Sequence, residues 1–200
     1  MKILIDNGHG LDTAGKCSPD GKYREWAWSR EIAQMIVDEL VRRGYDARRI
    51  VTETNDVSLT ERARRVNTIC SQVGTANVLL VSIHSNAAGN GQWMSARGWC
   101  AYTSRGNTKA DVLANCIYAE AQKQFVGHKI RTDYSDGDPD WEAGFAVLTK
   151  TKCPAVLTEN FFHDNREDVA FITSSAGKRA VVAAHVNGII AYIAQQGKVK

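Results

Sequence analysis

Apolar positions along the chain fall into two patterns, short unbroken runs and longer stripes at helical spacing. Residues 78–83 are almost entirely apolar, which is typical of a strand buried on both faces of a mostly parallel sheet. A shorter run at residues 2–6 predicts the first strand. Residues 29–43 place Ile32, Ile36 and Leu40 on one stripe, which predicts a helix that ends at Gly44.

The same patterns predict further strands and helices to the end of the chain. Ser58 and Glu61 fit a capping box, because the serine side chain can accept from the amide of Glu61, and this begins a helix to about Gln72. The other predicted strands are residues 46–52, 98–103, 146–148 and 155–158, and the other helices are residues 108–125, 166–173 and 178–194. The alternation predicts an α/β fold, a single-domain sandwich of a mostly parallel five- or six-stranded sheet with helices on both faces.

Composition and charge exclude several classes of protein. The chain has 200 residues, of which 44% are hydrophobic and 24% charged, so it holds enough apolar residues for a core and is not disordered. No apolar run approaches the roughly 20 residues of a membrane helix, so we expect no membrane span. A formal net charge of +3 gives no case for a nucleic-acid partner.

The cysteines and the first residues of the chain indicate the cellular compartment in which the protein is made. Five widely spaced cysteines form neither a disulfide framework nor a CxxC metal motif, so we expect free thiols. Met1-Lys2 leads directly into the first predicted strand, and no signal peptide is recognised. We therefore expect a protein made in the cytoplasm and released by another route, or a trimmed form of a secreted enzyme.

Four polar side chains are predicted to meet at one edge of the sheet. His9 follows the first strand, His84 the central strand and Glu159 the strand at residues 155–158, while Glu25 precedes the first helix. Ligands bind in open α/β sheets beyond the carboxyl ends of the strands. Two histidines and a carboxylate are a known ligand set for catalytic zinc, and a further carboxylate would act as proton acceptor. The alternative is that each histidine is merely hydrogen-bonded at a strand end, since the histidines do not form HExxH.

Four short motifs in a fixed order add a resemblance: Asp6-Asn7-Gly8-His9-Gly10, Arg24-Glu25, Ser82-Ile83-His84-Ser85-Asn86-Ala87 and Leu157-Thr158-Glu159-Asn160-Phe161. Together they resemble the zinc-dependent N-acetylmuramoyl-L-alanine amidase family, the type called amidase 3, known from cell-wall hydrolases and phage endolysins. The resemblance covers about residues 2–193. It implies a catalytic domain over residues 1–196. Because the sequence shows no internal repeat, low-complexity segment or linker, we expect no separate cell-wall-binding module.

The resemblance also assigns roles to individual residues. It implies that His9, Glu25 and His84 bind Zn²⁺ and that Glu159 is the catalytic acid and base. Glu31 lies close enough in sequence to leave a choice of carboxylate, but it would sit inside the helix, so Glu25 is preferred. Two residues past His84, Asn86 is our candidate for a substrate contact.

The function implied is zinc-dependent hydrolysis of the amide between the lactyl group of N-acetylmuramic acid and L-alanine in peptidoglycan. Two alternatives stay open: a zinc amidohydrolase acting on soluble acylated peptides, and a non-catalytic peptidoglycan-binding module with a structural zinc. We expect peptidoglycan or a muropeptide as the partner, a monomeric chain, and action on the cell wall after release, as for a prophage or phage lysin.

Some residues outside these motifs have two interpretations. The acidic loop at residues 133–142 is either solvated or holds calcium, although it lacks the ligand spacing of an EF-hand. Trp93 and Trp141 lie in predicted loops, where they either stack on sugar rings or fill space at the rim. His163, four residues past Glu159, is either structural or a substrate contact.

Overall fold

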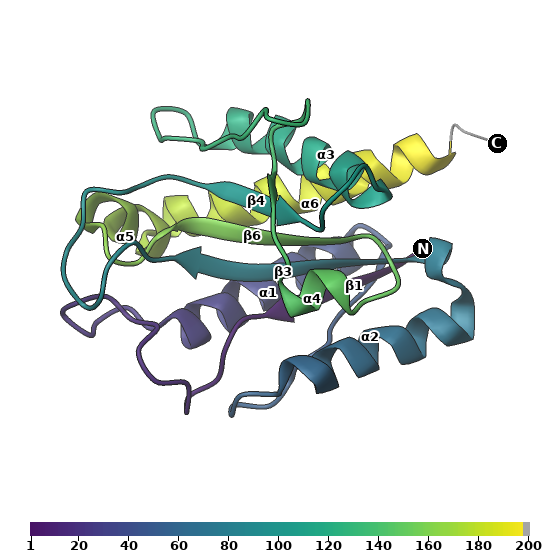
Figure 1. The fold of residues 1–200 in the computed structure, drawn as a ribbon, viewed down its shortest axis with the longest axis horizontal. Helices are drawn as coiled ribbons and strands as arrows, with labels where there is room; N and C mark the ends of the chain where they lie inside the picture. Colours follow the sequence, from purple (N-terminus) through teal and green to yellow (C-terminus); the bar gives the residue numbers. More distant parts are fainter. Residues whose placement is uncertain (198–200) are drawn as a thin grey trace.

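One six-stranded sheet organises the structure, a computed structural model that describes residues 1–197 (Figure 1). The strands are β1 (Lys2–Asn7), β2 (Asp46–Arg49), β3 (Val78–Asn86), β4 (Cys100–Thr103), β5 (Trp141–Glu142) and β6 (Ala155–Phe162). Their order across the sheet is β2-β1-β3-β6-β4-β5. All neighbours pair in parallel except β4 and β6, which are antiparallel. The prediction of a mostly parallel sheet of five or six strands is confirmed.

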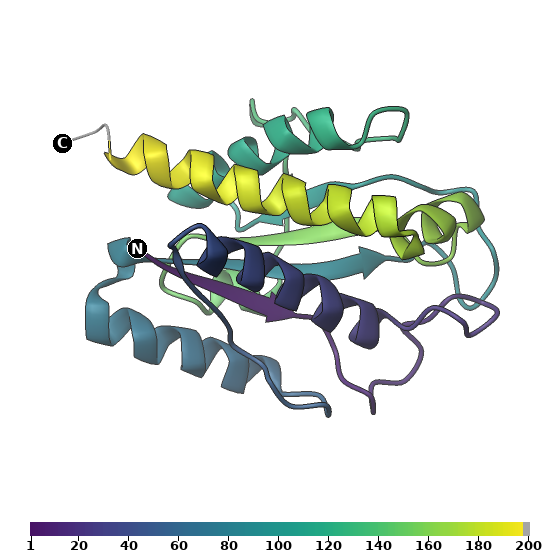
Figure 2. The ribbon, with the colours of Figure 1, turned by 180° about the vertical axis from the view of Figure 1, so that it is seen from behind.

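Helices cover both faces of this sheet, as predicted. They are α1 (Glu25–Arg42), α2 (Leu59–Val73), the short 3₁₀ helix η1 (Thr75–Asn77), α3 (Lys109–Gln124), α4 (Ala146–Thr149), α5 (Arg166–Thr173) and α6 (Ser175–Gly197). Helices α1 and α6 lie behind the sheet in Figure 1 and in front of it in Figure 2, whereas α4 lies on the opposite face. Among residues 1–197, no helix is long and apolar enough to cross a membrane.

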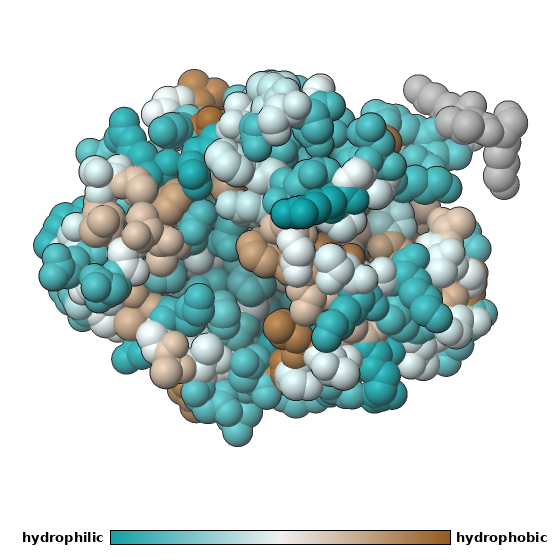
Figure 3. Space-filling view, in the orientation of Figure 1, coloured by the Kyte–Doolittle hydropathy of each residue, from teal (hydrophilic) through white to brown (hydrophobic). Residues whose placement is uncertain are grey.

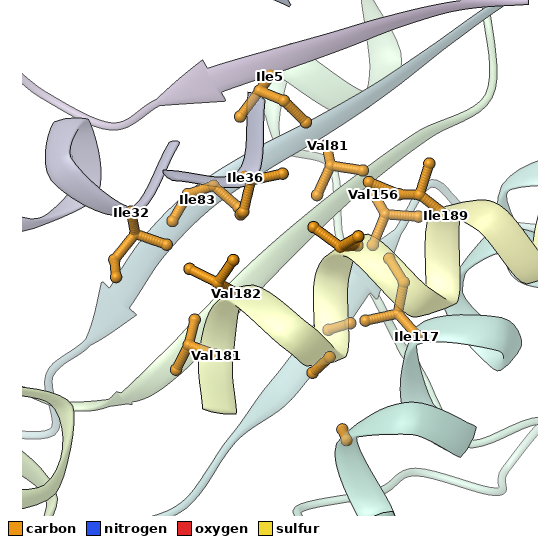
Figure 4. Close-up of a cluster of buried hydrophobic side chains, with 14 of the residues drawn as sticks. Ile5, Ile32, Ile36, Val81, Ile83, Ile117, Val156, Val181, Val182 and Ile189 are labelled. Carbon is orange, nitrogen blue, oxygen red and sulfur yellow. The ribbon is translucent and has the colours of Figure 1, made fainter. Parts of the chain in front are cut away.

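The alternation of side chains along the strands divides the core into two layers. On β1, Ile3 and Ile5 pack with α1, α3 and α6, whereas Leu4 packs on the other face with α2 and α4. Val81 and Ile83 of β3 join the first layer, which Figure 4 shows between the sheet and the helices. His84 therefore falls, by alternation, on the face of the sheet that α2 and α4 cover.

Three predicted boundaries that bear on the site are wrong. The ladder of β3 continues to Asn86 and that of β6 to Phe162, so His84 and Glu159 lie within strands rather than after them. Backbone pairing continues there because it requires no apolar side chain. Glu25 is likewise not before the helix but is its first residue, where a carboxylate is favoured by the helix dipole.

The strand predicted at residues 146–148 is also wrong, because these residues form α4. A short apolar run does not distinguish a strand from a turn of buried helix. Val147 and Leu148 are buried against the second core layer, and the amide of Lys150 closes the turn on the carbonyl of Ala146. This turn forms one wall of the cleft described below.

The order of the strands creates a crevice between β1 and β3. The chain leaves β1 through α1 to β2 on one side, then returns through α2 to β3 on the other side of β1. At such a switch point the two connections diverge to opposite faces, and the carboxyl ends of the strands border an opening. The turn after β1 and the end of β3 both lie at this opening.

The buried His185 of α6 makes stability depend on pH. Its side chain is 0% exposed, its Nδ1 lies 2.7 Å from the Val181 carbonyl oxygen and its Nε2 lies 2.9 Å from the Thr158 hydroxyl. Burial lowers the pKa of His185 from 6.5 to about 4. The unfolded chain therefore binds a proton that the folded chain does not, and the stability present above pH 6.5 is lost as the pH falls toward 4.

We expect the free energy of unfolding to fall by about 2–3 kcal/mol more between pH 7 and pH 4.5 in the wild type than in His185→Gln. The measurement is denaturant unfolding of both proteins after chelation, so that metal loss does not contribute. Equal pH slopes for the two proteins would show that His185 is not held neutral in the fold.

Candidate metal centre

The turn after β1 holds His9 in an unusual backbone conformation. The φ angle of His9 is 61°, in the left-handed region that a residue with a side chain adopts at a cost of roughly 1–3 kcal/mol. Two arginines hold the turn by its carbonyl oxygens. Arg30 donates to the carbonyl of His9 at 2.8 Å, and Arg62 donates to that of Asn7 at 2.7 Å. The surrounding side chains therefore fix the direction of the His9 ring.

Arg62 of α2 anchors this turn to the sheet. Its side chain is only 2% exposed, yet it bonds to Asp6 at 2.5 Å and to Asp56 at 2.8 Å. The second carboxylate oxygen of Asp6 accepts from the Ser82 hydroxyl on β3 at 2.6 Å. A buried arginine with all these partners holds a fixed geometry, because losing one partner would leave a buried charge unpaired.

The absence of a side chain at Gly8 admits the ring of His84. A Cβ built on Gly8 would lie 2.4 Å from Cε1 of His84, well inside van der Waals contact. His84 is also opposite Glu159 in the parallel pairing of β3 with β6. Paired residues of adjacent strands project from the same face of a sheet, so the imidazole and the carboxylate lie side by side.

Glu25 completes the group from the first turn of α1. Its Oε1 atom lies 3.1 Å from Nδ1 of His84 and 3.4 Å from Nε2 of His9, and it accepts from the Ser85 amide at 3.0 Å. The Glu25 side chain is 1% exposed, and its Oε2 atom has no hydrogen-bond partner. The sequence-predicted ligands His9, Glu25 and His84 are thus brought together, each offering one ligand atom within 4.8 Å of the others.

The donor set fits zinc. Ligand atoms at about 2.0–2.1 Å from a tetrahedral zinc are about 3.3 Å apart, which matches the distances of Glu25 Oε1 from the two imidazole nitrogens. Burial opposes the charge of Glu25, but hydrogen bonds with His84 and His9 hold its pKa well below the ordinary value of 4.5. Glu25 is thus an anionic carboxylate whose Oε1 atom faces two imidazoles, and this arrangement is suited to binding a cation. The role of these residues as metal ligands stays a prediction.

A buried layer behind Glu25 was not predicted from the sequence. Nδ1 of His163 lies 3.8 Å from Oε2 of Glu25 and 3.1 Å from the Ser85 hydroxyl, which in turn accepts from Tyr23 at 2.9 Å. His163 is 4% exposed, so it faces this layer rather than solvent. The only sequence signal for His163 is its position four residues past Glu159. The layer could not be predicted, because the sequence does not show which side chains meet across α1, β3 and β6.

Glu159 lies in the cleft beside the three candidate ligands. Its Oε2 atom is buried without a hydrogen-bond partner, and burial raises the pKa of Glu159 to about 7. The cleft has a volume of about 230 Å³ and is bordered by α2 and α4. Figure 3 shows the face of the molecule on which α4 lies, which is mostly hydrophilic with smaller hydrophobic areas. The lining includes His9, His84, Glu159, Lys16, Leu59 and Val147.

Other candidates lie outside this group. Glu31 pairs with Lys178 at 2.7 Å, which removes it from the choice of carboxylate. Asn86 does not line the cleft, and its side-chain oxygen accepts from the Ala87 amide at 2.8 Å, so its contact with substrate stays a prediction. Arg166 lies 4.2 Å from the ring centre of Trp93, and Arg131 lies 5.3 Å from that of Trp141, which lies in β5 rather than in the predicted loop.

Comparison with known proteins shows which family the chain resembles along its length. The N-acetylmuramoyl-L-alanine amidase family model matches residues 3–191. An endolysin of Bacillus phage SPP1 is 28% identical over 191 residues, and the N-acetylmuramoyl-L-alanine amidase CwlM of Bacillus licheniformis is 29% identical over 191 residues, each covering 94% of this chain. The chain spans 64% of the length of the endolysin and 67% of that of CwlM.

Solved structures of similar fold include two amidases. An N-acetylmuramoyl-L-alanine amidase from Clostridium difficile 630 has a TM-score of 0.79 at 25% identity, covering 98% of both chains. The catalytic domain of CwlV from Paenibacillus polymyxa has a TM-score of 0.79 at 21% identity, covering 97% of this chain and 99% of that one. The α/β fold is therefore shared over almost the whole chain.

The close approach of Gly8 and His84 provides a test of the metal centre. We expect Gly8→Ala to displace the His84 ring and to lower metal affinity by about 10–100-fold or more, because orientation of a ligand controls its binding. The matched control is Gly144→Ala, where a Cβ meets no atom within 4 Å. The measurement is metal bound per chain in titrations of both variants. Equal affinities would show that His84 does not need this geometry to bind metal.

Proposed function

Because the chain belongs to the N-acetylmuramoyl-L-alanine amidase family, we propose that it hydrolyses the amide between the lactyl group of N-acetylmuramic acid and L-alanine in peptidoglycan. The observation that carries this proposal is a buried, unpartnered oxygen of Glu159 beside the group formed by His9, Glu25 and His84. The printed names of the relatives, an endolysin and an amidase, support action on the cell wall.

We further propose that the group holds Zn²⁺. Two imidazoles and one carboxylate suit a borderline cation and leave one coordination position for water or substrate. When bound, zinc supplies Lewis-acid chemistry, which makes water more acidic and stabilises negative charge on a carbonyl oxygen. His9 and His84 would bind as neutral imidazoles, and Glu25 would supply one negative charge.

Glu159 would move the proton in this reaction. Its carboxylate accepts the proton of the attacking water as the new bond to the lactyl carbonyl carbon forms. It then delivers that proton to the nitrogen of L-alanine, so that the nitrogen leaves as an amine rather than as an anion. Because burial raises the pKa of Glu159 to about 7, its carboxyl group both accepts and releases a proton readily near neutral pH.

The unpartnered oxygen of Glu159 is also evidence about the two alternative functions. A binding module with a structural zinc does not need a further carboxylate beside the zinc ligands, and burying one without a hydrogen-bond partner is costly. Glu159 therefore favours an enzyme. A zinc amidohydrolase of soluble acylated peptides would use the same chemistry and differ only in substrate. Intact cell walls and soluble acylated peptides are therefore compared in the experiment.

We expect Glu159→Gln to lower turnover by roughly 10²–10⁴-fold, because the amide keeps the shape of the side chain but cannot accept a proton. Zinc content and binding to cell walls should stay unchanged, because neither needs a base. The measurement is release of L-alanine amino groups from purified cell walls and from a soluble acylated peptide, with zinc content determined on the same samples.

The control variant is Glu31→Gln, on the exposed side of α1, which should keep both zinc and activity. Loss of zinc in Glu159→Gln would make Glu159 a ligand, and near-normal turnover would place the base elsewhere. Wild-type activity on the soluble peptide alone would contradict peptidoglycan as the substrate.

A further inference from the structure

Three aspartates form a second cluster, contributed by elements other than those of the metal centre. Asp111 lies in the first turn of α3, whereas Asp138 and Asp140 belong to the loop before β5. Each offers one carboxylate oxygen, and the three atoms all lie within 4.8 Å of one another. Within residues 1–197, no lysine, arginine or histidine forms a salt bridge with any of the three. The three carboxyl groups are therefore close together without a compensating side chain, and burial and the neighbouring Asp138 raise the pKa of Asp140 to about 8.

Asp140 is the aspartate of this cluster with one carboxylate oxygen that has no hydrogen-bond donor among residues 1–197. Asp140 is only 2% exposed, and its Oδ2 atom accepts a hydrogen bond from the Thr103 hydroxyl at 2.6 Å. Its Oδ1 atom is buried and has no hydrogen-bond partner. A carboxylate oxygen removed from water without a donor is costly, and deep burial of a charge normally requires a counter-ion or a metal.

Secondary structure accounts for only one of the three aspartates. Asp111 is part of the capping box of α3, in which its carboxylate accepts from the Thr108 amide. Among residues 1–197, no side-chain hydrogen bond to the backbone explains why Asp138 and Asp140 approach Asp111. A carboxylate has about four lone-pair sites, so Asp111 can cap the helix and still offer an oxygen to a ligand.

We propose that Asp111, Asp138 and Asp140 form a binding site for a calcium ion. Calcium binds six to eight oxygens at about 2.3–2.6 Å, and the three carboxylates would provide part of such a set, which water would complete. The donors are all oxygen, unlike the imidazole-containing group at His9 and His84, so this cluster favours a hard cation. The charge of the ion would offset the repulsion among the three aspartates.

A cation at this cluster would hold one wall of the cleft in place. It would join the loop at Asp138 and Asp140 to α3, and that loop continues into Trp141 and Phe145. Phe145 lines the cleft, and the ring of Tyr102 packs 5.3 Å from it and 6.4 Å from Trp141. The ion would thus fix a segment beside the substrate without touching the zinc ligands.

Terbium luminescence provides a direct test, because Tb³⁺ takes oxygen ligands like those of calcium and Trp141 is adjacent to Asp140 in the chain. We expect zinc-loaded protein to give a saturable signal on excitation of tryptophan, with one Tb³⁺ per chain displaced by Ca²⁺. Asp140→Asn should weaken binding at least tenfold. Asp136→Asn, an exposed residue of the same loop outside the cluster, is the matched control and should bind normally.

Thermal unfolding provides a second measurement that does not depend on tryptophan. Calcium at about 100 times the wild-type Kd should raise the Tm of the wild type and of Asp136→Asn by about 5–10 °C, and should raise that of Asp140→Asn by no more than about half as much. If Asp140→Asn does not fold, Asp138→Asn takes its place, because Asp138 is only half-buried. Unsaturable terbium binding, or equal calcium effects on the Tm of all variants, would overturn the proposal.

Discussion

The buried carboxylate of Glu25 is the constraint on which the rest of the site depends. It is nearly inaccessible to water and has one oxygen with no hydrogen-bond partner. Leaving such a charge unpaired is costly, so the surrounding structure must supply positive charge. His84 and His9 face the other oxygen at 3.1 and 3.4 Å, which is the spacing of ligands around a tetrahedral zinc. The fold thus places a negative charge where a cation would offset it.

Much of the surrounding structure keeps these two imidazoles in position. Gly8 leaves room for the ring of His84, and the strained turn at His9 is held by Arg30 and Arg62 through backbone carbonyls. Arg62 makes no hydrogen bond to the side chains of His9, Glu25 or His84, yet it links α2 to β1 through Asp6 and to the turn through the His9 carbonyl. These contacts bind the turn to α1 and α2 through polar groups, and a hydrogen-bonded polar network of this kind specifies one arrangement of its members.

The sequence predicted the fold class and named His9, Glu25 and His84 as candidate ligands, which the structure brings together, but it did not show the contacts behind them. Apolar runs predict which strands are buried, and short motifs place His9 and Glu159 near strand ends. The apolar run at residues 146–148 misled the prediction, because a turn of buried helix has the same composition. His163 and Asp140 acquire their surroundings only through long-range packing, which no local pattern records. The assignment of residues 1–196 to one catalytic domain without a cell-wall-binding module stays a prediction.

X-ray absorption at the zinc edge of the purified protein would test the proposal that His9, Glu25 and His84 bind zinc. We expect one zinc per chain, with two imidazole nitrogens and a carboxylate oxygen at about 2.0–2.1 Å and no sulfur neighbour. A sulfur shell at about 2.3 Å, contributed by the free cysteines, would contradict it. So would a protein that binds no zinc when supplied with it.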